Sequence, residues 1–277
     1  MPKVIRSRDN RNKPIVVNDE LLNRTYFNRL RLAPGDTYEE RLVDFETLYV
    51  VLSGTVDIVV DGEHFRDVGQ REDIWSGRAD SVYVPVGACV RIESPRGNVE
   101  IAVAGALCKT PFKAFRIRPE DVDMVDVGST GTHSRRRIFH ILGQSTIGRT
   151  GHLLVSELYA DEGCWSGYPP HKHDTDRTEG ETAHEELYHY RFSPESGFGV
   201  QLTYEDGQEN CYMTRDGDTI LVDRGYHPTA SSPGHRSYIF TILVGKTKRG
   251  LVQYFDPRHA HLVSAIPGIQ AMRDKFK

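Results

Sequence analysis

Turn residues interrupt this chain at short intervals, and that rhythm limits the folds open to it. In LYVVLSGTVDIVVDGEHF, residues 48–65, apolar residues form short blocks or alternate with polar ones, and Ser53-Gly54 and Asp61-Gly62 separate the blocks. Such blocks, bounded by glycine and Asp-Gly pairs, are typical of antiparallel strands joined by turns. The same pattern recurs in SVYVPVGACVRIES, VEIAVAGA, HLLVSELYA, ELYHYRF, VQLTYEDGQENCYMT, DTILVD and SYIFTILVG.

Helical spacing is plausible only at residues 18–30 and in the tail IQAMRDKF, so we predict an all-β protein with a few short helices. The two halves also resemble each other: VGQREDIWSGRADSVYVPVGACVRI corresponds to MTRDGDTILVDRGYHPTAS. This indicates a duplicated β-barrel unit. The polar, glycine-containing middle of RIRPEDVDMVDVGSTGTHSRRRIFHIL indicates a connector. We therefore predict two barrels, residues 1–130 and 131–277.

The bulk composition is that of a water-soluble globular protein. The chain has 277 residues, 35 basic and 39 acidic side chains and a net charge of -4, which favours neither nucleic acid nor a membrane surface. No apolar run approaches the roughly 20 residues that cross a bilayer, and the first residues lack the apolar stretch of a signal peptide. We expect a cytoplasmic protein. The four cysteines are scattered and are expected to be reduced.

A pair of histidines, His171 and His173, stands in the stretch SGYPPHKHDTD. Alternation along a strand points both imidazole rings to one face and Lys172 to the other. Imidazole is a common metal ligand. The pair alone is equally compatible with two polar loop residues, so the metal hypothesis needs further ligands.

The strand HEELYHYRF supplies a carboxylate. A period of two places Glu186, Tyr188, Tyr190 and Phe192 on one face, which indicates an inward face that begins with an acid. A buried carboxylate without a partner costs several kcal/mol, and a metal held by the two histidines would supply a partner. Glu185 is the alternative ligand.

A third imidazole follows the strand DGDTILVD. His227 comes after the turn at residues 223–225, and Pro228 suits the start of a strand. Neighbouring strands of a barrel lie about 4.8 Å apart, so residues roughly 40 positions apart can meet inside it. Three imidazoles and one carboxylate make a mixed site for one divalent ion, compatible with Zn, Mn, Fe, Co or Ni.

These positions resemble the two-part signature of cupins. The signature comprises Gly163, His171, His173, Glu186, Gly217-Asp218 and Gly225-x-His227. The spacing from His173 to Glu186 is longer than usual for cupins, with DTDRTEGETAHE between them. More closely, WSGYPPHKHD, EELYHYRF, GFGVQLTYED, GDTILVDRGYHP and SPGH resemble the 5-deoxy-glucuronate isomerases of bacterial myo-inositol catabolism, which are bicupins with two tandem jelly-roll barrels. The related 5-keto-4-deoxyuronate isomerases share the H-x-H and E-x-Y-x-Y patterns, which implies the ligand role of Glu186.

This resemblance implies an aldose-ketose isomerase that converts 5-deoxy-D-glucuronate to 5-dehydro-2-deoxy-D-gluconate. A divalent cation would stabilise charge on the substrate oxygens, and either proton transfer through a base or a hydride shift gives this product. The candidate catalytic residues are Tyr168, Tyr188 and Tyr238. The candidate arginines for the substrate carboxylate are Arg137, Arg191 and Arg236.

Several readings stay open at this level. The N-terminal barrel has no histidine pair and no G-x-H, so we expect it to lack metal and to serve packing or assembly. A homo-oligomer is plausible because pairing covers exposed strand edges. The alternative functions are a 5-keto-4-deoxyuronate isomerase, an iron-dependent cupin dioxygenase, and a sugar-binding cupin without turnover.

Overall fold

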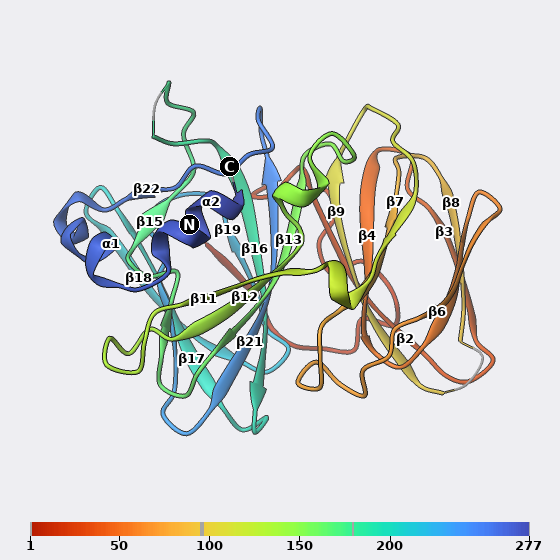
Figure 1. Ribbon diagram of the computed structural model, residues 1–277, viewed down its shortest axis with the longest axis horizontal. Helices are drawn as coiled ribbons and strands as arrows, with labels where there is room; N and C mark the ends of the chain where they lie inside the picture. Colours follow the sequence, from red (N-terminus) through yellow and green to blue (C-terminus); the bar gives the residue numbers. More distant parts are fainter. Residues whose placement is uncertain (1, 95–96, 179, 277) are drawn as a thin grey trace. The chain divides into compact units, whose positions relative to one another are not determined.

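Antiparallel strands form nearly all of the regular structure in the computed structural model, which describes residues 2–94, 97–178 and 180–276 (Figure 1). The all-β prediction is confirmed. The Asp61-Gly62 pair joins β5 (Val56–Val60) to β6 (Glu63–Val68), and both turn residues have positive φ angles, 46° and 88°. An Asp-Gly pair of this conformation matches the twist of a tight hairpin, so the turn chemistry read from the sequence fixes this register.

The chain divides into two units. The N-terminal unit comprises Asp9–Val122 and Ser145–Leu153, and the C-terminal unit comprises Met1–Arg8, Asp123–Gln144 and Leu154–Lys277. The boundary expected near residue 130 falls inside a stretch of the C-terminal unit. The division into barrels at 1–130 and 131–277 stays a prediction.

The N-terminal unit contains two sheets around one apolar core. Side chains from both sheets share a single cluster of buried residues, so the sheets pack face to face. The five-stranded sheet has the order β10 (Phe115–Ile117), β7 (Asp80–Val84), β4 (Phe45–Ser53), β9 (Val99–Leu107) and β2 (Thr25–Leu32). The four-stranded sheet has the order β3 (Thr37–Arg41), β8 (Cys89–Glu93), β5 and β6.

The prediction of a helix at residues 18–30 is wrong, because Thr25–Leu32 form the strand β2. Seven of the eight side chains of this strand are buried, so the two-residue alternation that marks a half-exposed strand is missing there. The tail helix is confirmed as α2 (Ile269–Phe276). It follows α1 (His261–Ala265) and the short 3-10 turns at Pro119–Asp121, Gln144–Thr146 and Pro257–His259.

The C-terminal unit is built on a seven-stranded sheet, in which β16, β21 and β13 lie side by side (Figure 1). Its order is β1 (Lys3–Ile5), β19 (Thr219–Val222), β16 (His184–Ser193), β21 (Arg236–Gly245), β13 (Leu153–Ala160), β12 (Arg136–Leu142) and β11 (Asp123–Val127). A second sheet comprises β14 (Trp165–Ser166), β20 (Thr229–Ser231), β17 (Phe198–Glu205) and β18 (Gln208–Arg215). A separate two-stranded sheet comprises β15 (His171–Lys172) and β22 (Tyr254–Phe255).

The interior of this unit differs from a wholly apolar core. Apolar residues of α2 and β11 share one cluster, but Glu186, His227 and Gln201 are also buried in the unit. Buried polar groups require partners, and the Tyr190 hydroxyl, for example, donates to the Gln201 carbonyl at 2.6 Å. The polar interior therefore marks where a site can form.

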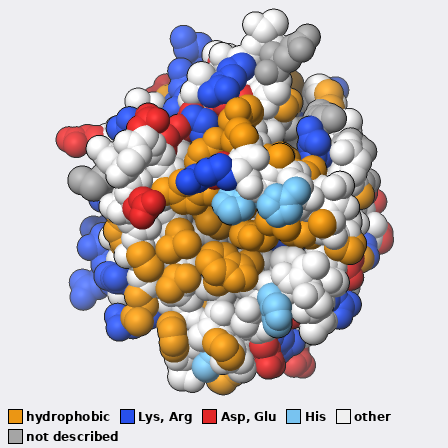
Figure 2. Space-filling model, turned by 90° about the vertical axis from the view of Figure 1, so that its left-hand side faces the viewer, with side chains coloured by type: hydrophobic (Ala, Val, Ile, Leu, Met, Phe, Trp, Pro, Cys, Tyr) orange, Lys and Arg blue, Asp and Glu red, His pale blue; other side chains and the backbone are white. Residues whose placement is uncertain are grey.

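Figure 2 shows one face of the molecule, and hydrophobic side chains gather in the middle of that face. Apolar patches of this kind are common at interfaces between subunits, and the homo-oligomer expected from the sequence stays a prediction. Within the described residues, no helix is long and apolar enough to cross a membrane.

Candidate metal centre

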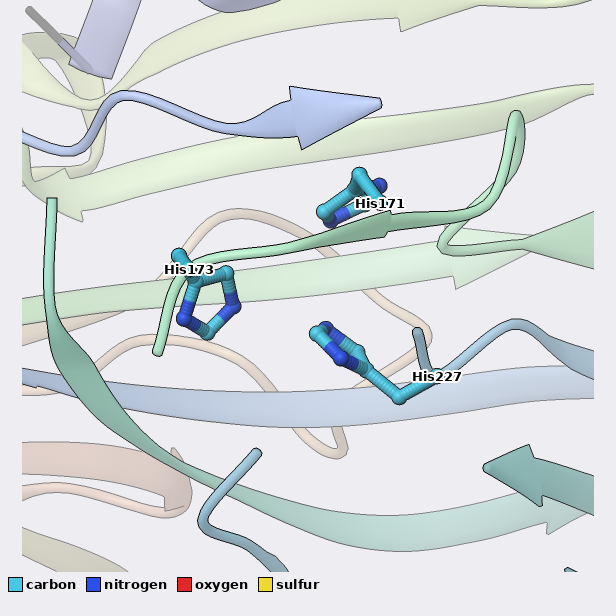
Figure 3. A group of neighbouring side chains, drawn as sticks. All are labelled: His171, His173 and His227. Atoms are coloured by element: carbon cyan, nitrogen blue, oxygen red, sulfur yellow. The ribbon is translucent and has the colours of Figure 1, made fainter. Parts of the chain in front are cut away.

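The two histidines of the H-x-H motif lie on and just after β15. Their rings point into the space opposite His227 (Figure 3). Lys172 extends the other way, where its ammonium group binds the carboxylates of Asp174 and Glu205. The alternation of a strand thus separates the two imidazoles from the lysine between them. All three histidines are buried.

Glu186 and His227 reach the same space from two neighbouring segments. Glu186 lies on β16, paired with Val222 of β19. Gly225 has a φ of 81°, and its carbonyl accepts a hydrogen bond from Nδ1 of His227 at 2.7 Å. A residue with a side chain rarely adopts that φ, so the glycine of G-x-H makes the turn that aims the imidazole.

The four groups converge at the distances expected of ligands to one ion. Candidate ligand nitrogens of the three histidines lie within 4.8 Å of one another. Oε2 of Glu186 lies 2.9 Å from Nε2 of His173 and 3.0 Å from Nε2 of His227. Ligands that share one ion at bonds of about 2.0 to 2.2 Å lie roughly 3 to 4 Å apart. The two Glu186 distances match this spacing, and a small shift would bring the histidine nitrogens to it, so the residues fit a metal.

The protons on the imidazoles support the same interpretation. Nδ1 of His171 donates to the Pro169 carbonyl at 3.1 Å, as Nδ1 of His227 does to Gly225, which leaves a lone pair on each Nε2. Among the described residues, Nε2 of His227 and Nδ1 of His173 are buried without a hydrogen-bond partner. Nε2 of His227 and Oε2 of Glu186 stand 3.0 Å apart, close enough to share one bound cation.

Burial and mutual charge set the protonation of the cluster. Burial, with the nearby His227 and His173, lowers the pKa of His171 to about 3. Burial raises the pKa of Glu186, but His173 and His227 lower it by more, so it lies well below its usual range. Burial lowers the pKa of His227, but the Glu186 carboxylate raises it by more. A neutral His171 and an ionised Glu186 are the forms that bind metals.

A pocket opens beside the cluster and is lined by charged, polar and apolar side chains. His171, Glu186 and Tyr188 line it together with Arg136 and Gln253. The rest of the wall is mainly apolar and comprises Ile138, Ser156, Leu158, Gly167, Thr241, Leu243, Leu251 and Met272. Its free space of about 50 Å³ holds a few water molecules, so a larger ligand enters only if part of the wall moves.

The three candidate tyrosines lie in different surroundings. Tyr188 lines the pocket, and its ring centroid lies 6.2 Å from that of His227. Tyr168 packs on the apolar cluster that includes α2, and its carbonyl accepts a hydrogen bond from Arg136 at 2.6 Å. Tyr238 is fully buried, and its hydroxyl donates to Glu157 at 2.8 Å. Of the three, the structure brings only Tyr188 to the wall of the pocket.

None of the three candidate arginines lines this pocket. Arg137 and Arg236 are exposed, and Arg191 forms an ion pair with Asp216 at 3.1 Å. Arg136, one position from Arg137, lines the pocket instead. Side chains two positions apart on a strand share a face, so an inward-facing, apolar Ile138 would have placed Arg136 on the inner face as well.

Gln253 is a second pocket residue that the sequence reasoning missed. Its amide nitrogen donates to Nε2 of His171 at 2.9 Å. It precedes β22, whose Phe255 pairs with His171 of β15. No sequence motif marks this residue, since only the pairing of two distant strands brings it to the histidine.

The all-β fold and this cluster define a protein of the cupin class. Oxalate decarboxylase from Bacillus subtilis shares the fold, with a TM-score of 0.61 at 11% identity over 87% of this chain and 74% of that one. A further structure of that decarboxylase is described with Mn(II) centres. The likeness at such low identity concerns the fold alone.

More specifically, the chain belongs to the KduI/IolB family, whose model matches residues 3–262. The 5-deoxy-glucuronate isomerase of Geobacillus kaustophilus is 34% identical over 220 residues, which cover 78% of each chain. That of Lacticaseibacillus casei is 32% identical over 239 residues, 84% of this chain and 86% of the relative. An IolB-like protein from Salmonella typhimurium LT2 superimposes with a TM-score of 0.84 at 27% identity, over 90% of this chain and 94% of that one.

Proposed function

We propose that this chain is a metal-dependent aldose-ketose isomerase that converts 5-deoxy-D-glucuronate to 5-dehydro-2-deoxy-D-gluconate in myo-inositol catabolism. The observation that carries the proposal is the convergence of three buried imidazoles, two of which contact the Glu186 carboxylate. The 5-deoxy-glucuronate isomerases among its relatives support the substrate. A cytoplasmic location is part of the proposal.

The proposed ligands are His171, His173, Glu186 and His227, which would hold one divalent ion of Zn, Mn, Fe, Co or Ni. Such an ion, when bound, draws electron density from the substrate oxygens and stabilises the charge that develops there. Among the described residues, the three-histidine group is the one cluster of its kind, and it lies in the C-terminal unit. We assign the N-terminal unit a role in packing or assembly.

Tyr188 supplies a hydrogen-bond donor beside the ligands. Burial, followed by the charge of Glu186, raises the pKa of Tyr188 well above its usual value, so the hydroxyl keeps its proton at neutral pH. We assign it the donation of a hydrogen bond to a substrate oxygen. Gln253 can donate from the other side, because its amide already points at His171. The rest of the pocket wall is mainly apolar.

The decisive experiment compares the parent protein with His171→Ala, and with His235→Ala as the control, because His235 lies in a turn where it contacts Ser232. We expect about one divalent ion per chain by elemental analysis in the parent and the control, and a large loss in His171→Ala. Isomerisation of 5-deoxy-D-glucuronate, followed by NMR, should be lost in step.

Three outcomes would contradict the proposal. The first is equal, near-zero metal in parent and variant. The second is turnover of 5-keto-4-deoxyuronate in place of 5-deoxy-D-glucuronate. The third is oxygen consumption that depends on ferrous ion, which would instead support a dioxygenase.

A further inference from the structure

We infer that Arg136 anchors the carboxylate of the substrate and so selects sugar acids over neutral sugars. The inference rests on the proposed function, since it assigns the far end of the substrate of that same site. Arg136 begins β12, is 2% exposed, and lines the pocket together with His171 and Glu186.

The charge of Arg136 has no anionic partner among the residues that the structure describes. One terminal nitrogen donates to the Ser134 carbonyl at 2.8 Å and the other to the Tyr168 carbonyl at 2.6 Å. Among the described residues no carboxylate forms an ion pair with this guanidinium, and its buried Nε has no hydrogen-bond partner. By contrast, the partly buried Arg191 is paired with Asp216.

A buried cation of this kind is costly unless a ligand neutralises it. Burial lowers the pKa of Arg136 to about 10, so the side chain is still charged at neutral pH. Glu186, the carboxylate that lines the same pocket, is held by His173 and His227. An incoming anion would therefore find a positive charge in the pocket wall that no described carboxylate offsets.

The chemistry of the pocket matches a molecule with two different ends. Carbonyl and hydroxyl oxygens suit the histidine cluster, and a carboxylate suits the remaining N–H donors of the guanidinium, whose planar fork binds carboxylates. Ile138, Leu158 and Leu243 line the same pocket. An apolar wall strengthens a charged hydrogen bond by lowering the local dielectric.

The test compares Arg136→Met and Arg136→Lys with Arg137→Met as the matched control. Arg137 is the exposed neighbour on the opposite face of the same strand. Each protein is assayed with 5-deoxy-D-glucuronate and with 5-deoxy-D-glucose, in which a hydroxymethyl group replaces the carboxylate. We expect kcat/KM for the acid to fall roughly 100-fold in Arg136→Met and roughly 10-fold in Arg136→Lys, and to stay within about twofold in the control.

The change should be specific to the acid. Turnover of 5-deoxy-D-glucose should change less than about threefold, because that substrate offers Arg136 no charge. Metal content should equal that of the parent in all variants. If Arg136→Met alone loses metal or melts at a much lower temperature, Arg136→Lys decides the question, since it keeps the charge but not the fork.

Calorimetry separates this inference from the proposed function. D-gluconate and D-glucitol have no carbonyl group to isomerise, so their binding is measured without turnover. We expect the parent to bind D-gluconate more tightly, and Arg136→Met to lose most of that preference. An unchanged preference in Arg136→Met overturns the inference even if the parent is an isomerase. A parent that binds D-gluconate through Arg136 but never isomerises the acid overturns the proposed function alone.

Discussion

Replacing Glu186 by glutamine tests the metal centre most directly, because it removes one charge and almost no volume. Oε2 of Glu186 lies 2.9 and 3.0 Å from two imidazole nitrogens. Losing a hydrogen-bond partner of a metal ligand typically costs 10- to 100-fold in affinity, and losing a ligand itself costs more. We therefore expect Glu186→Gln to weaken metal binding at least about 100-fold, which corresponds to about 2.7 kcal/mol.

The assay is titration of the protein with a competing chelator, followed by elemental analysis after dialysis. Glu185→Gln is the matched control, because Glu185 is buried on the same strand but points to the opposite face from Glu186. Equal metal affinity in Glu186→Gln and the parent would refute the assignment of this carboxylate. A loss confined to Glu185→Gln would transfer the ligand role to the neighbouring residue.

Two further predictions concern hydrogen bonds. Tyr188→Phe should lower kcat roughly tenfold and leave the metal content unchanged, because it removes a protonated donor from the pocket wall; unchanged kcat would exclude that role. The Tyr204 hydroxyl and the Arg258 side chain donate hydrogen bonds to the Asp256 carboxylate. Burial raises the pKa of Asp256, but these donors lower it by more, so that it falls from 3.8 to about 2. A carboxyl group whose pKa is lower in the folded than in the unfolded protein stabilises the fold at pH values above its unfolded-state pKa. That stabilisation is lost as the pH falls through its folded-state pKa. Asp256→Asn should therefore lower the free energy of unfolding, measured in urea at pH 7, by about 1 to 2 kcal/mol. The difference between parent and variant should narrow as the pH falls from about 3.8 toward 2. A difference that does not change with pH would contradict this account.

The strands were predictable because most of them leave a local signature. In β5 the side chains alternate between buried and partly buried positions, and Asp61-Gly62 marks its end. The signature fails in β2, where burial on both faces removes the alternation. Sequence periodicity reports a contrast between two environments, so a strand with one environment on both faces resembles a helix segment.

The histidine cluster was accessible to the same reasoning because its members stand at strand positions and turns with recognisable spacing. Gly225 illustrates this, since its positive φ aims His227 at the cluster. Gln253 was not accessible, because it reaches His171 through the pairing of β15 with β22, which lie far apart in the sequence. Pairing of distant strands depends on the whole fold and not on local pattern.

The arginines show where the sequence reasoning and the structure differ. The candidates for the substrate carboxylate were Arg137, Arg191 and Arg236, whereas the arginine that lines the pocket is Arg136. The alternation of side chains along the strand distinguishes Arg136 from Arg137, since Ile138 lines the pocket and the residue two positions before it, Arg136, lies on the same face.

The fold does not determine the reaction, because an oxalate decarboxylase shares it. This pocket combines a histidine-glutamate cluster with a buried guanidinium that no described carboxylate neutralises. Together, the two features favour a ligand that has oxygen donors at one end and a negative charge at the other.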